Sequence, residues 1–347
     1  MEIGSEFSEN SISFGENKYF SIVDYPKRYV LSGRTGLHLI AKELKASVEN
    51  ISLPNYSCNS MILPFYTEKF NISFYDSINL DNVVLNRSIQ AILIMDYFGF
   101  LSMKTFNFVV KCKNAGVIVI VDATQTAFSH AETYRLADYI VISYRKWFDS
   151  LCAVVYSKNG FKLPKIDSEN HFYDETWRKA ARIKASYLNS LTSDKSKYLK
   201  LYAEANQNLS HDYIGYTANK EEIEIVSKAD SSTIRKLRRE NAGYLIHEIK
   251  KIQNKFGVQL IFDNMKEEDC PLFVPLLLDE KNRFAIRDVL IKNDIYCPIH
   301  WPIDGRYPYE NTSYHRRELS LICDQRYGIR EMGRQISVLT QALQSNC

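Results

Sequence analysis

The sequence contains no run of about 18 apolar residues, the length that a membrane-spanning helix needs. Its first residues, MEIGSEFSENSISF, are acidic and lack the basic-then-apolar order of a secretory signal peptide. We therefore expect no membrane span, no membrane partner and a cytoplasmic location.

Cysteine occurs seven times, but no pair has the Cys-x-x-Cys spacing of a zinc or redox site. The seven positions are Cys58, Cys112, Cys152, Cys270, Cys297, Cys323 and Cys347. An odd number of scattered cysteines also argues against a disulfide framework. A reducing compartment and the absence of a metal site are the expectations.

An excess of charge of one sign is also missing. Lys and Arg number 44 against 41 Asp and Glu, the formal net charge is +3, and no long basic run occurs, so a nucleic-acid partner has little support.

The chain does have an ordinary globular composition, with 45% apolar and 24% charged residues. Its 347 residues suffice for two domains, which we place at 1–215, including an N-terminal arm, and 216–347.

Apolar runs alternate with helical patterns in the first half of the chain. The patterns at residues 72–78, 91–100 and 117–122 predict strands, and 91–100 is nearly all apolar, as in a strand buried on both faces. Strands that alternate with helices predict a large, mainly parallel, doubly wound α/β sheet. Later residues combine a long helix, 230–257, with short strand-like runs and a C-terminal amphipathic helix, which predicts a small α+β domain.

An acid and an amine follow two successive apolar runs. Asp122 ends the run that begins at Val117, and the run from Tyr139 to Ile142 continues into a polar segment that ends at Lys146. Open α/β sheets bind their ligands at the carboxyl ends of the strands, so the two groups are expected to lie close together. An aspartate and a lysine in these positions are the groups that a pyridoxal phosphate enzyme needs most.

A turn with two glycines, SGRTG at residues 32–36, precedes a helical pattern. Free N–H groups, the positive end of the helix dipole and the Arg34 guanidinium would suit a phosphate group. An ordinary capped turn explains the same residues equally well. The glycines lack the GxGxxG spacing of a dinucleotide-binding fold, which argues against a Rossmann-type dehydrogenase.

Short segments occur here in an order known from one protein family. They are SGRTGLHL (32–39), LPNYSCNS (53–60), IMDYFGF (94–100), VDATQT (121–126), SYRKW (143–147), IYCPIHWP (295–302) and CDQRYG (323–328). The chain thereby resembles the DegT/StrS-type sugar aminotransferases, which are fold-type I pyridoxal phosphate enzymes. The resemblance extends over residues 28–342, nearly the whole sequence.

The resemblance implies distinct roles for three residues. Lys146 would bind pyridoxal 5'-phosphate covalently and then move the proton between substrate and cofactor. Asp122 would pair with the pyridinium nitrogen, and Gln125 would lie beside the 3-oxygen of the ring. The plainer alternatives are a surface lysine next to Arg145, a capping aspartate and a packing glutamine.

Further positions follow from the same resemblance. Arg34, Thr35 and Ser143 would bind the cofactor phosphate, and Cys58 takes a position that often carries an aromatic residue stacked on the ring. The residues expected on the substrate side are Tyr97, His300 and Trp301. A structural role for His300, the more common one for a lone histidine in an apolar strand, stays open.

Two departures from the family pattern concern the substrate pocket. Residues 148–152, FDSLC, stand where better-known members have a glycine-rich turn after the lysine. Residues 185–191, ASYLNSL, are only loosely similar to the segment that reaches into the neighbouring subunit in those members. Both departures affect what the pocket recognises and leave the cofactor-binding residues in place.

The function that the resemblance implies is transfer of an amino group from an amino acid, expected to be L-glutamate, to a keto-sugar. The sugar is expected to be nucleotide-linked, the pathway to be cell-surface polysaccharide or secondary-metabolite biosynthesis, and the enzyme to be a homodimer with shared active sites. One alternative is a decarboxylase or dehydratase of the same fold, although the sugar dehydratases of the group replace the lysine with histidine. The other is a non-catalytic binding protein, which would not need Asp122, Gln125 and Lys146 together.

Overall fold

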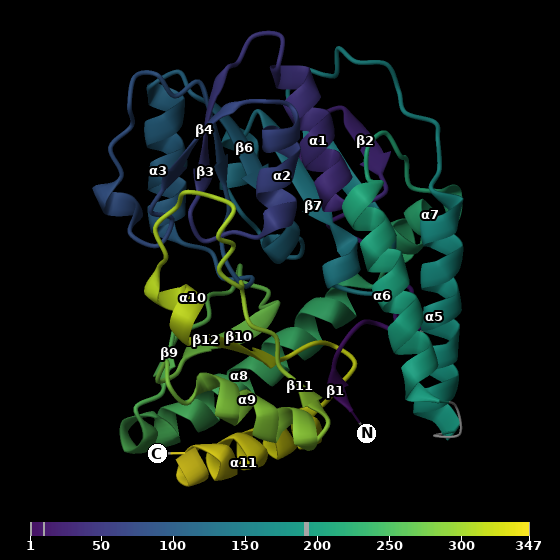
Figure 1. The fold of residues 1–347 in the computed structure, drawn as a ribbon, viewed down its shortest axis with the longest axis vertical. Coiled ribbons are helices and arrows are strands. Elements are labelled where there is room, and N and C mark those ends of the chain that lie inside the picture. The colour runs from purple at the N-terminus through teal and green to yellow at the C-terminus, as the bar shows by residue number, and fades with distance from the viewer. Residues whose placement is uncertain (1, 10, 191–193, 347) are drawn as a thin grey trace.

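The computed structural model describes residues 2–9, 11–190 and 194–346, and a seven-stranded sheet organises its first half (Figure 1). In spatial order the strands are β2 (Lys27–Val30), β8 (Ala153–Ser157), β7 (Tyr139–Ser143), β6 (Ile118–Asp122), β5 (Ala91–Ile94), β3 (Asn50–Pro54) and β4 (Asn71–Tyr75). Neighbouring strands from β4 to β7 are parallel, whereas β8 is antiparallel to both β7 and β2. The expected mainly parallel sheet is confirmed.

Helices cover both faces of this sheet because its central strands are apolar on both sides. The helices are α1 (Gly33–Leu44), α2 (Asn59–Thr67), α3 (Met103–Asn114) and α4 (Thr133–Leu136), with 3-10 turns η1 (Leu80–Asn82), η2 (Thr124–Thr126) and η3 (Tyr144–Lys146). On β5, Leu93 packs into the core that contains α1 and α2, whereas Ile92 and Ile94 pack into the core that contains α3. This alternation is the two-sided burial of a doubly wound sheet.

Helix α1 starts at the carboxyl edge of the sheet and packs very closely against it. Ser32 caps its N-terminus by accepting the Thr35 N–H at 3.2 Å. A Cβ at Gly36 would lie 2.8 Å from side-chain atoms of Val141 and of Val155, closer than real Cβ atoms come. The glycine therefore permits this close packing, which fixes where the start of α1 meets the sheet.

A helical hairpin follows the sheet. Helices α5 (His171–Ser190) and α6 (Lys195–His211) pack against each other, and α7 (Lys220–Lys228) comes next. Aromatic rings fill the hairpin, among them Trp177 and Tyr202 with centroids 4.7 Å apart.

The last third of the chain is built on α8 (Ser231–Phe256), which begins at the Asp230 cap and ends at Gly257 with a left-handed φ of 66°. It packs against α11 (Ile329–Asn346) and against β9 (Gln259–Leu260) and β10 (Phe273–Leu277), which form an antiparallel sheet with β12 (Glu318–Ile322). Helix α9 (Arg283–Lys292) packs against α11 and β12, and α10 (Ser313–Arg317) packs against β10 and β12. This is the expected α+β arrangement. One apolar core continues from the large sheet into this part, and the boundary at residue 215 stays a prediction.

The N-terminal residues pair with the far end of the chain. Strand β1 (Ile3–Gly4) runs parallel to β11 (Ile295–Tyr296), and the two lie next to the lower end of α5 and α6 in Figure 1. Within the segment IYCPIHWP only these two residues form a strand, and it joins the N-terminus, not the sheet of β10. We call residues 2–7 the N-terminal strap.

The described part of the chain contains no helix long and apolar enough to cross a membrane. The same residues hold no cluster of three or more His, Cys, Asp or Glu side chains that could bind a metal ion. The six cysteines within the described ranges are free thiols; Cys347 lies outside those ranges.

Candidate active site

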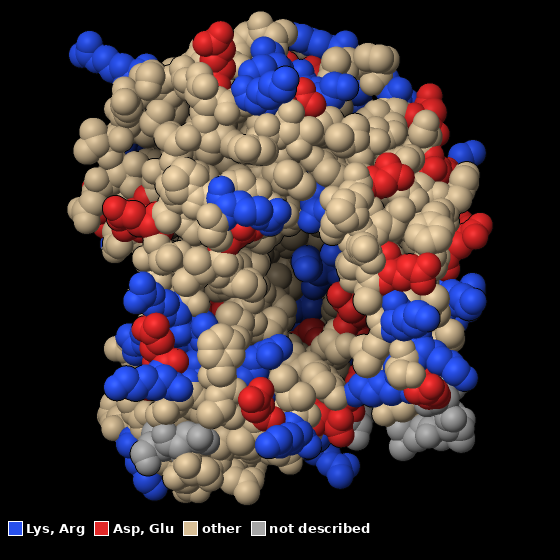
Figure 2. Space-filling model, in the orientation of Figure 1, with Lys and Arg blue, Asp and Glu red and all other residues tan. Residues whose placement is uncertain are grey.

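The carboxyl ends of β6 and β7 bring the predicted acid and amine to the same edge of the sheet. The two strands are parallel neighbours, with Asp122 opposite Val141. Strand β7 ends at Ser143, and η3 then carries Lys146. This edge faces the C-terminal part of the molecule. Figure 2 shows that the molecule is hollowed near its centre and that Lys or Arg side chains are visible inside the hollow.

Asp122 is a buried carboxyl group with no cation beside it. One oxygen, Oδ1, accepts the Thr124 N–H at 2.9 Å, and the side chain is 6% exposed. Burial raises the pKa of Asp122 above its usual value, although hydrogen bonds from Thr124 oppose the shift. Among the described residues, no Lys, Arg or His forms an ion pair with this carboxyl group. A ligand that brings a positive charge would therefore be stabilised here.

Lys146 is the complementary case, an amine without a partner. Its side chain is exposed to solvent, and within the described ranges it makes no hydrogen bond or ion pair. Protein atoms nevertheless crowd the ammonium group, so lost hydration, followed by repulsion from Arg145, lowers the pKa of Lys146, while Glu6 and Cys58 oppose the shift. A lowered pKa increases the fraction of neutral amine, the form that attacks a carbonyl carbon.

The neighbouring Arg145 points elsewhere. Its Nη1 donates to Asn206 Oδ1 at 2.9 Å, and its guanidinium lies 4.8 Å from the Trp177 ring centroid. Arg145 is therefore anchored to the α5–α6 hairpin, whereas Lys146 is left free. The predicted role of Lys146 stays a prediction.

The start of α1 forms a cradle with the ends of β6 and β7. A Cβ at Gly33 would lie 3.2 Å from Ser143 Cβ and 3.9 Å from Thr124 Oγ1, so the three residues converge on one point. Thr124 Oγ1 also accepts the Ser143 N–H at 3.1 Å. The first N–H groups of a helix have no partner within the helix and attract anions.

Arg34 adds a guanidinium group to this cradle. Its Nη1 donates to the Leu209 carbonyl at 3.1 Å, but its Nε is buried and has no hydrogen-bond partner. Burial lowers the pKa of Arg34, and the group still stays charged at neutral pH. A buried, unpaired N–H on a cation is the donor that a phosphate oxygen would satisfy.

Thr35 has its polar groups engaged within the protein, and its predicted contact with the cofactor phosphate stays a prediction. Its hydroxyl donates to the Tyr213 carbonyl at 2.8 Å and lies 2.9 Å from Ser32 Oγ. With its N–H also bonded to Ser32, Thr35 fixes the start of α1 and offers no free donor to a phosphate group. Thr124, which the sequence did not single out, occupies the position beside Ser143 instead.

Gln125 and Cys58 lie on the walls of the same site. Gln125 is buried, and its Oε1 accepts the Phe98 N–H. Cys58 precedes α2, with its Sγ 2.8 Å from Ser60 Oγ, and it lies near both Arg34 and Lys146. The predicted contacts of both residues with a cofactor ring stay predictions.

Tyr97, His300 and Trp301 join the two parts of the molecule. The Tyr97 hydroxyl is buried, 2.8 Å from both the Tyr56 carbonyl and Ser77 Oγ. The Trp301 ring lies 5.0 Å from the Tyr56 ring. Tyr97 therefore already has its hydrogen-bond partners, and its predicted contact with substrate stays a prediction.

His300 is held from within the C-terminal part. Its N–H donates to Glu318 Oε2 at 2.6 Å, and its Nδ1 lies 3.1 Å from Ser320 Oγ. Its ring packs 5.0 Å from Phe273 and 5.4 Å from Phe98. These contacts favour the structural alternative for this histidine. A substrate contact by His300 or Trp301 stays a prediction.

The segment after Lys146, residues 148–152, is held by an ion-pair network with two buried carboxylates. Arg178 donates to Asp149 Oδ2 at 2.5 Å and, through Nε, to Glu222 Oε1 at 2.7 Å. Glu222 Oε2 also accepts the Leu151 N–H at 2.7 Å, and Trp177 Nε1 donates to Asp149 at 3.2 Å. Of the other departing segment, residues 185–190 end α5, and residue 191 lies outside the described residues.

No protein-family model and no curated protein sequence matches this chain. Solved structures do match. Helicobacter pylori PseC, an aminotransferase involved in the biosynthesis of pseudoaminic acid, has a TM-score of 0.64 and 13% identity over 99% of this chain and 94% of that one. NtdA from Bacillus subtilis with bound cofactor PMP has a TM-score of 0.63 and 13% identity, over 96% of this chain and 78% of that one. DesI in the presence of its TDP-sugar product has a TM-score of 0.61 and 13% identity, over 92% of this chain and 81% of that one.

The chain has the fold of the fold-type I aminotransferases. The resemblance first indicated by the short sequence segments is therefore confirmed at the level of the fold. At 13% identity, the roles of individual residues rest on the geometry of this chain and not on the likeness.

Proposed function

We propose that this protein is a pyridoxal-phosphate-dependent aminotransferase that transfers an amino group from an amino acid to a keto-sugar. The observation that carries the proposal is a pair of unpartnered groups at one sheet edge. Asp122 is a buried carboxyl group without a cation, and Lys146 is an amine without any partner in the described part of the chain. Burying a carboxylate without compensation is costly, so Asp122 suggests a ligand that brings a positive charge, and Lys146 lies at the same sheet edge with its amine free to react.

The residues fit pyridoxal 5'-phosphate group by group. Asp122 would hold a protonated ring nitrogen, whose positive charge supplies the missing ion pair. The start of α1 at Gly33, the Ser143 hydroxyl and the unpaired Nε of Arg34 would hold the phosphate. Lys146 would form the covalent link to the cofactor.

When bound, the cofactor supplies an electron-accepting ring that carries the amino group from the donor to the acceptor. Lys146 Nζ would take the proton from the α-carbon of the donor and later return a proton to the acceptor, which its lowered pKa favours near neutral pH. The Asp122 carboxylate would stabilise positive charge throughout.

The finer parts of the proposal come from the likeness. DesI is described with a TDP-sugar product, so we propose a nucleotide-linked keto-sugar as acceptor, with L-glutamate as donor. The pathway would be cell-surface polysaccharide or secondary-metabolite biosynthesis. We also propose a homodimer with shared active sites, working in the cytoplasm without nucleic acid or membrane partners.

The test is the absorbance spectrum of the purified protein with pyridoxal phosphate, followed by borohydride reduction and peptide mass analysis. We expect a reduced cofactor on Lys146, none on Lys146→Ala, and normal labelling in the exposed control Lys158→Ala. Adding L-glutamate alone should convert the bound cofactor to pyridoxamine phosphate. A wild-type protein that cannot be labelled at Lys146 refutes the proposal and favours a binding protein. Labelling without conversion by any amino acid favours a decarboxylase or dehydratase.

A further inference from the structure

Trp147, the residue directly after Lys146, is held from two sides. It has no exposed surface, and its indole Nε1 donates to the Thr124 carbonyl at 2.7 Å. Its own carbonyl oxygen accepts a short hydrogen bond from Gln325 Nε2 at 2.6 Å and a longer one from Arg238 Nη2 at 3.5 Å. Thr124 is the residue whose N–H binds Asp122. Trp147 therefore links the lysine segment to two places. Through Thr124 it is connected to Asp122, and through Gln325 it is connected to the C-terminal turn 324–327.

Arg238 of α8 fixes the orientation of Gln325. The guanidinium is buried and lies 4.6 Å from the Trp147 ring centroid. Its Nε donates to Gln325 Oε1 at 2.7 Å, and its Nη1 donates to the Leu272 carbonyl at 3.0 Å. Because arginine can only donate, it selects the oxygen of the Gln325 amide. The NH2 group of that amide is thereby directed to the carbonyl of Trp147.

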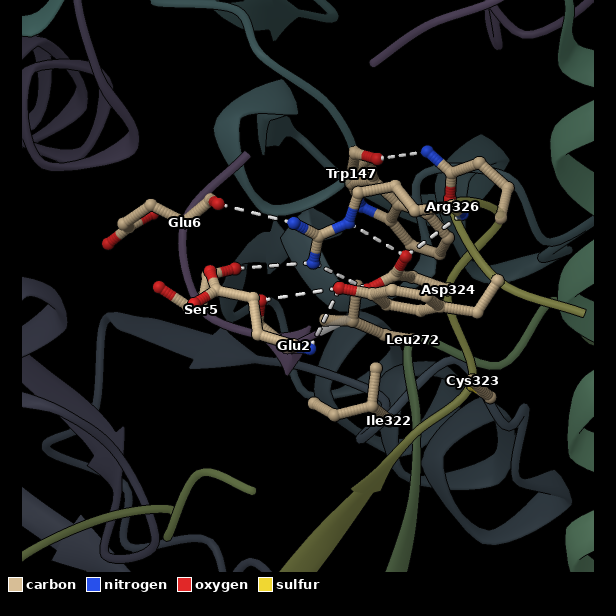
Figure 3. A network of polar contacts seen from close by, with 12 residues as sticks. Glu2, Ser5, Glu6, Trp147, Leu272, Ile322, Cys323, Asp324 and Arg326 are labelled. Carbon is tan, nitrogen blue, oxygen red and sulfur yellow. Dashed lines mark hydrogen bonds and ion pairs between the residues drawn. The ribbon is translucent and has the colours of Figure 1, made fainter. Parts of the chain in front are cut away.

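The N-terminal strap holds the same turn from outside (Figure 3). Arg326 donates to the carbonyl oxygens of Ser5 and Glu6, both at 3.2 Å, and to Asp324 Oδ2 at 2.7 Å. The Gly4 N–H donates to the Tyr327 hydroxyl at 2.9 Å. Figure 3 shows the strap, the turn and Trp147 as parts of one polar network. Gln325 is the member of the turn that reaches the lysine segment.

We propose that Gln325 is a positioning residue for Lys146. The Gln325 amide fixes the carbonyl of Trp147, the next residue after the lysine, and thereby sets the position of the Lys146 backbone relative to Asp122. The proposal rests on the proposed function of Lys146 and adds a residue that touches neither substrate nor cofactor. A small displacement of a reacting group can lower its rate by orders of magnitude, so a single hydrogen bond at this point has consequences for reactivity.

The test compares Gln325→Glu and Gln325→Ala with wild type. Glutamate keeps an oxygen for Arg238 but, when ionised, has no hydrogen to donate to Trp147, and alanine removes both contacts. Gln335→Glu is the control because Gln335, like Gln325, is a glutamine whose amide bonds the backbone. It accepts the N–H of Ile322 at 2.8 Å and donates to the Ile322 carbonyl at 2.9 Å, and it does not contact the lysine segment. The readouts are the rate of covalent attachment of pyridoxal phosphate at Lys146 and the melting temperature.

We expect both Gln325 variants to react at Lys146 about tenfold more slowly than wild type, because the Trp147 carbonyl loses its short hydrogen bond and keeps only the longer one from Arg238 Nη2 at 3.5 Å. Gln335→Glu should lower the melting temperature without slowing attachment. Wild-type attachment rates in folded Gln325→Glu or Gln325→Ala would overturn the inference, as would equal slowing in Gln335→Glu. A wild-type protein that does not react at Lys146 would instead refute the proposed function, so the two failures are distinguishable.

Discussion

The strap is fastened to the helical hairpin by a buried lysine whose titration can be measured. Lys184 of α5 has no exposed side-chain surface, and its Nζ lies 3.1 Å from Glu2 Oε1 and donates to the Glu6 carbonyl. Burial, followed by repulsion from Arg326, lowers the pKa of Lys184 to about 8, although Glu2 opposes the shift. The perturbation to make is Lys184→Met, which keeps the length of the side chain and removes the charge.

The sign of the effect follows from linkage. The folded state holds the Lys184 proton less tightly than the unfolded chain, in which a lysine titrates near 10.5. Below pH 8 the group is charged in both states, and the cost of burying the charge is fully present. As pH rises from 8 to 10.5, the folded state loses the proton first and that cost disappears. The difference between the two pKa values corresponds to about 3 kcal/mol in the free energy of unfolding.

The assay is urea unfolding of wild type and Lys184→Met at a series of pH values from about 7 to about 10.5. We expect the unfolding free energy of wild type to rise relative to the variant by about 2–3 kcal/mol over this range. Lys179→Met, an exposed site on the same helix, should run parallel to wild type. A constant difference between wild type and Lys184→Met would show that the lysine is not destabilised by burial, and the reasoning would be wrong.

Three other substitutions test the site and its frame. Asp122→Asn should lower transamination at least about a hundredfold, measured as kcat with L-glutamate, while the cofactor still attaches covalently; unchanged kcat would contradict its electrostatic role. Arg178→Met should lower the free energy of unfolding by about 3–5 kcal/mol in urea, because Asp149 and Glu222 stay buried without their cation; a loss below about 1 kcal/mol would contradict this. Gly33→Ala places a Cβ 3.2 Å from the end of β7 and should weaken cofactor binding about tenfold in a titration; unaltered affinity would argue against the cradle.

The elements that the sequence predicted well are those with a strong hydrophobic pattern. Strands β5 and β6 are continuous apolar runs, and both are buried on two faces as expected. The placement of Asp122 and Lys146 follows from the same pattern, because parallel neighbours end at the same edge of a sheet. The hydrophobic pattern of the sequence was therefore sufficient to place Asp122 and Lys146 at the same edge of the sheet.

The parts that could not be predicted depend on contacts between distant segments. Strand β1 has two residues, too few for any periodicity, and its partner β11 is nearly the whole chain away. Thr35 has a sequence suited to phosphate binding, but the Tyr213 carbonyl takes its hydroxyl, and Tyr213 could not be located in advance. His300 has its partners on β12, a strand that the sequence did not suggest.

The missing glycine-rich turn is explained by the way this chain anchors its lysine segment. At the start of the segment, Trp147 is hydrogen-bonded through both its indole and its carbonyl. Further along, Glu222 accepts the Leu151 N–H, and Arg178 binds the Asp149 carboxylate. Glycines would allow a close backbone approach but would leave the segment freer. Here the backbone on the C-terminal side of Lys146 is held by buried polar contacts, while the lysine side chain itself has no partner within the described residues. A rigid frame around one free amine is the arrangement that preorganises a reactive group.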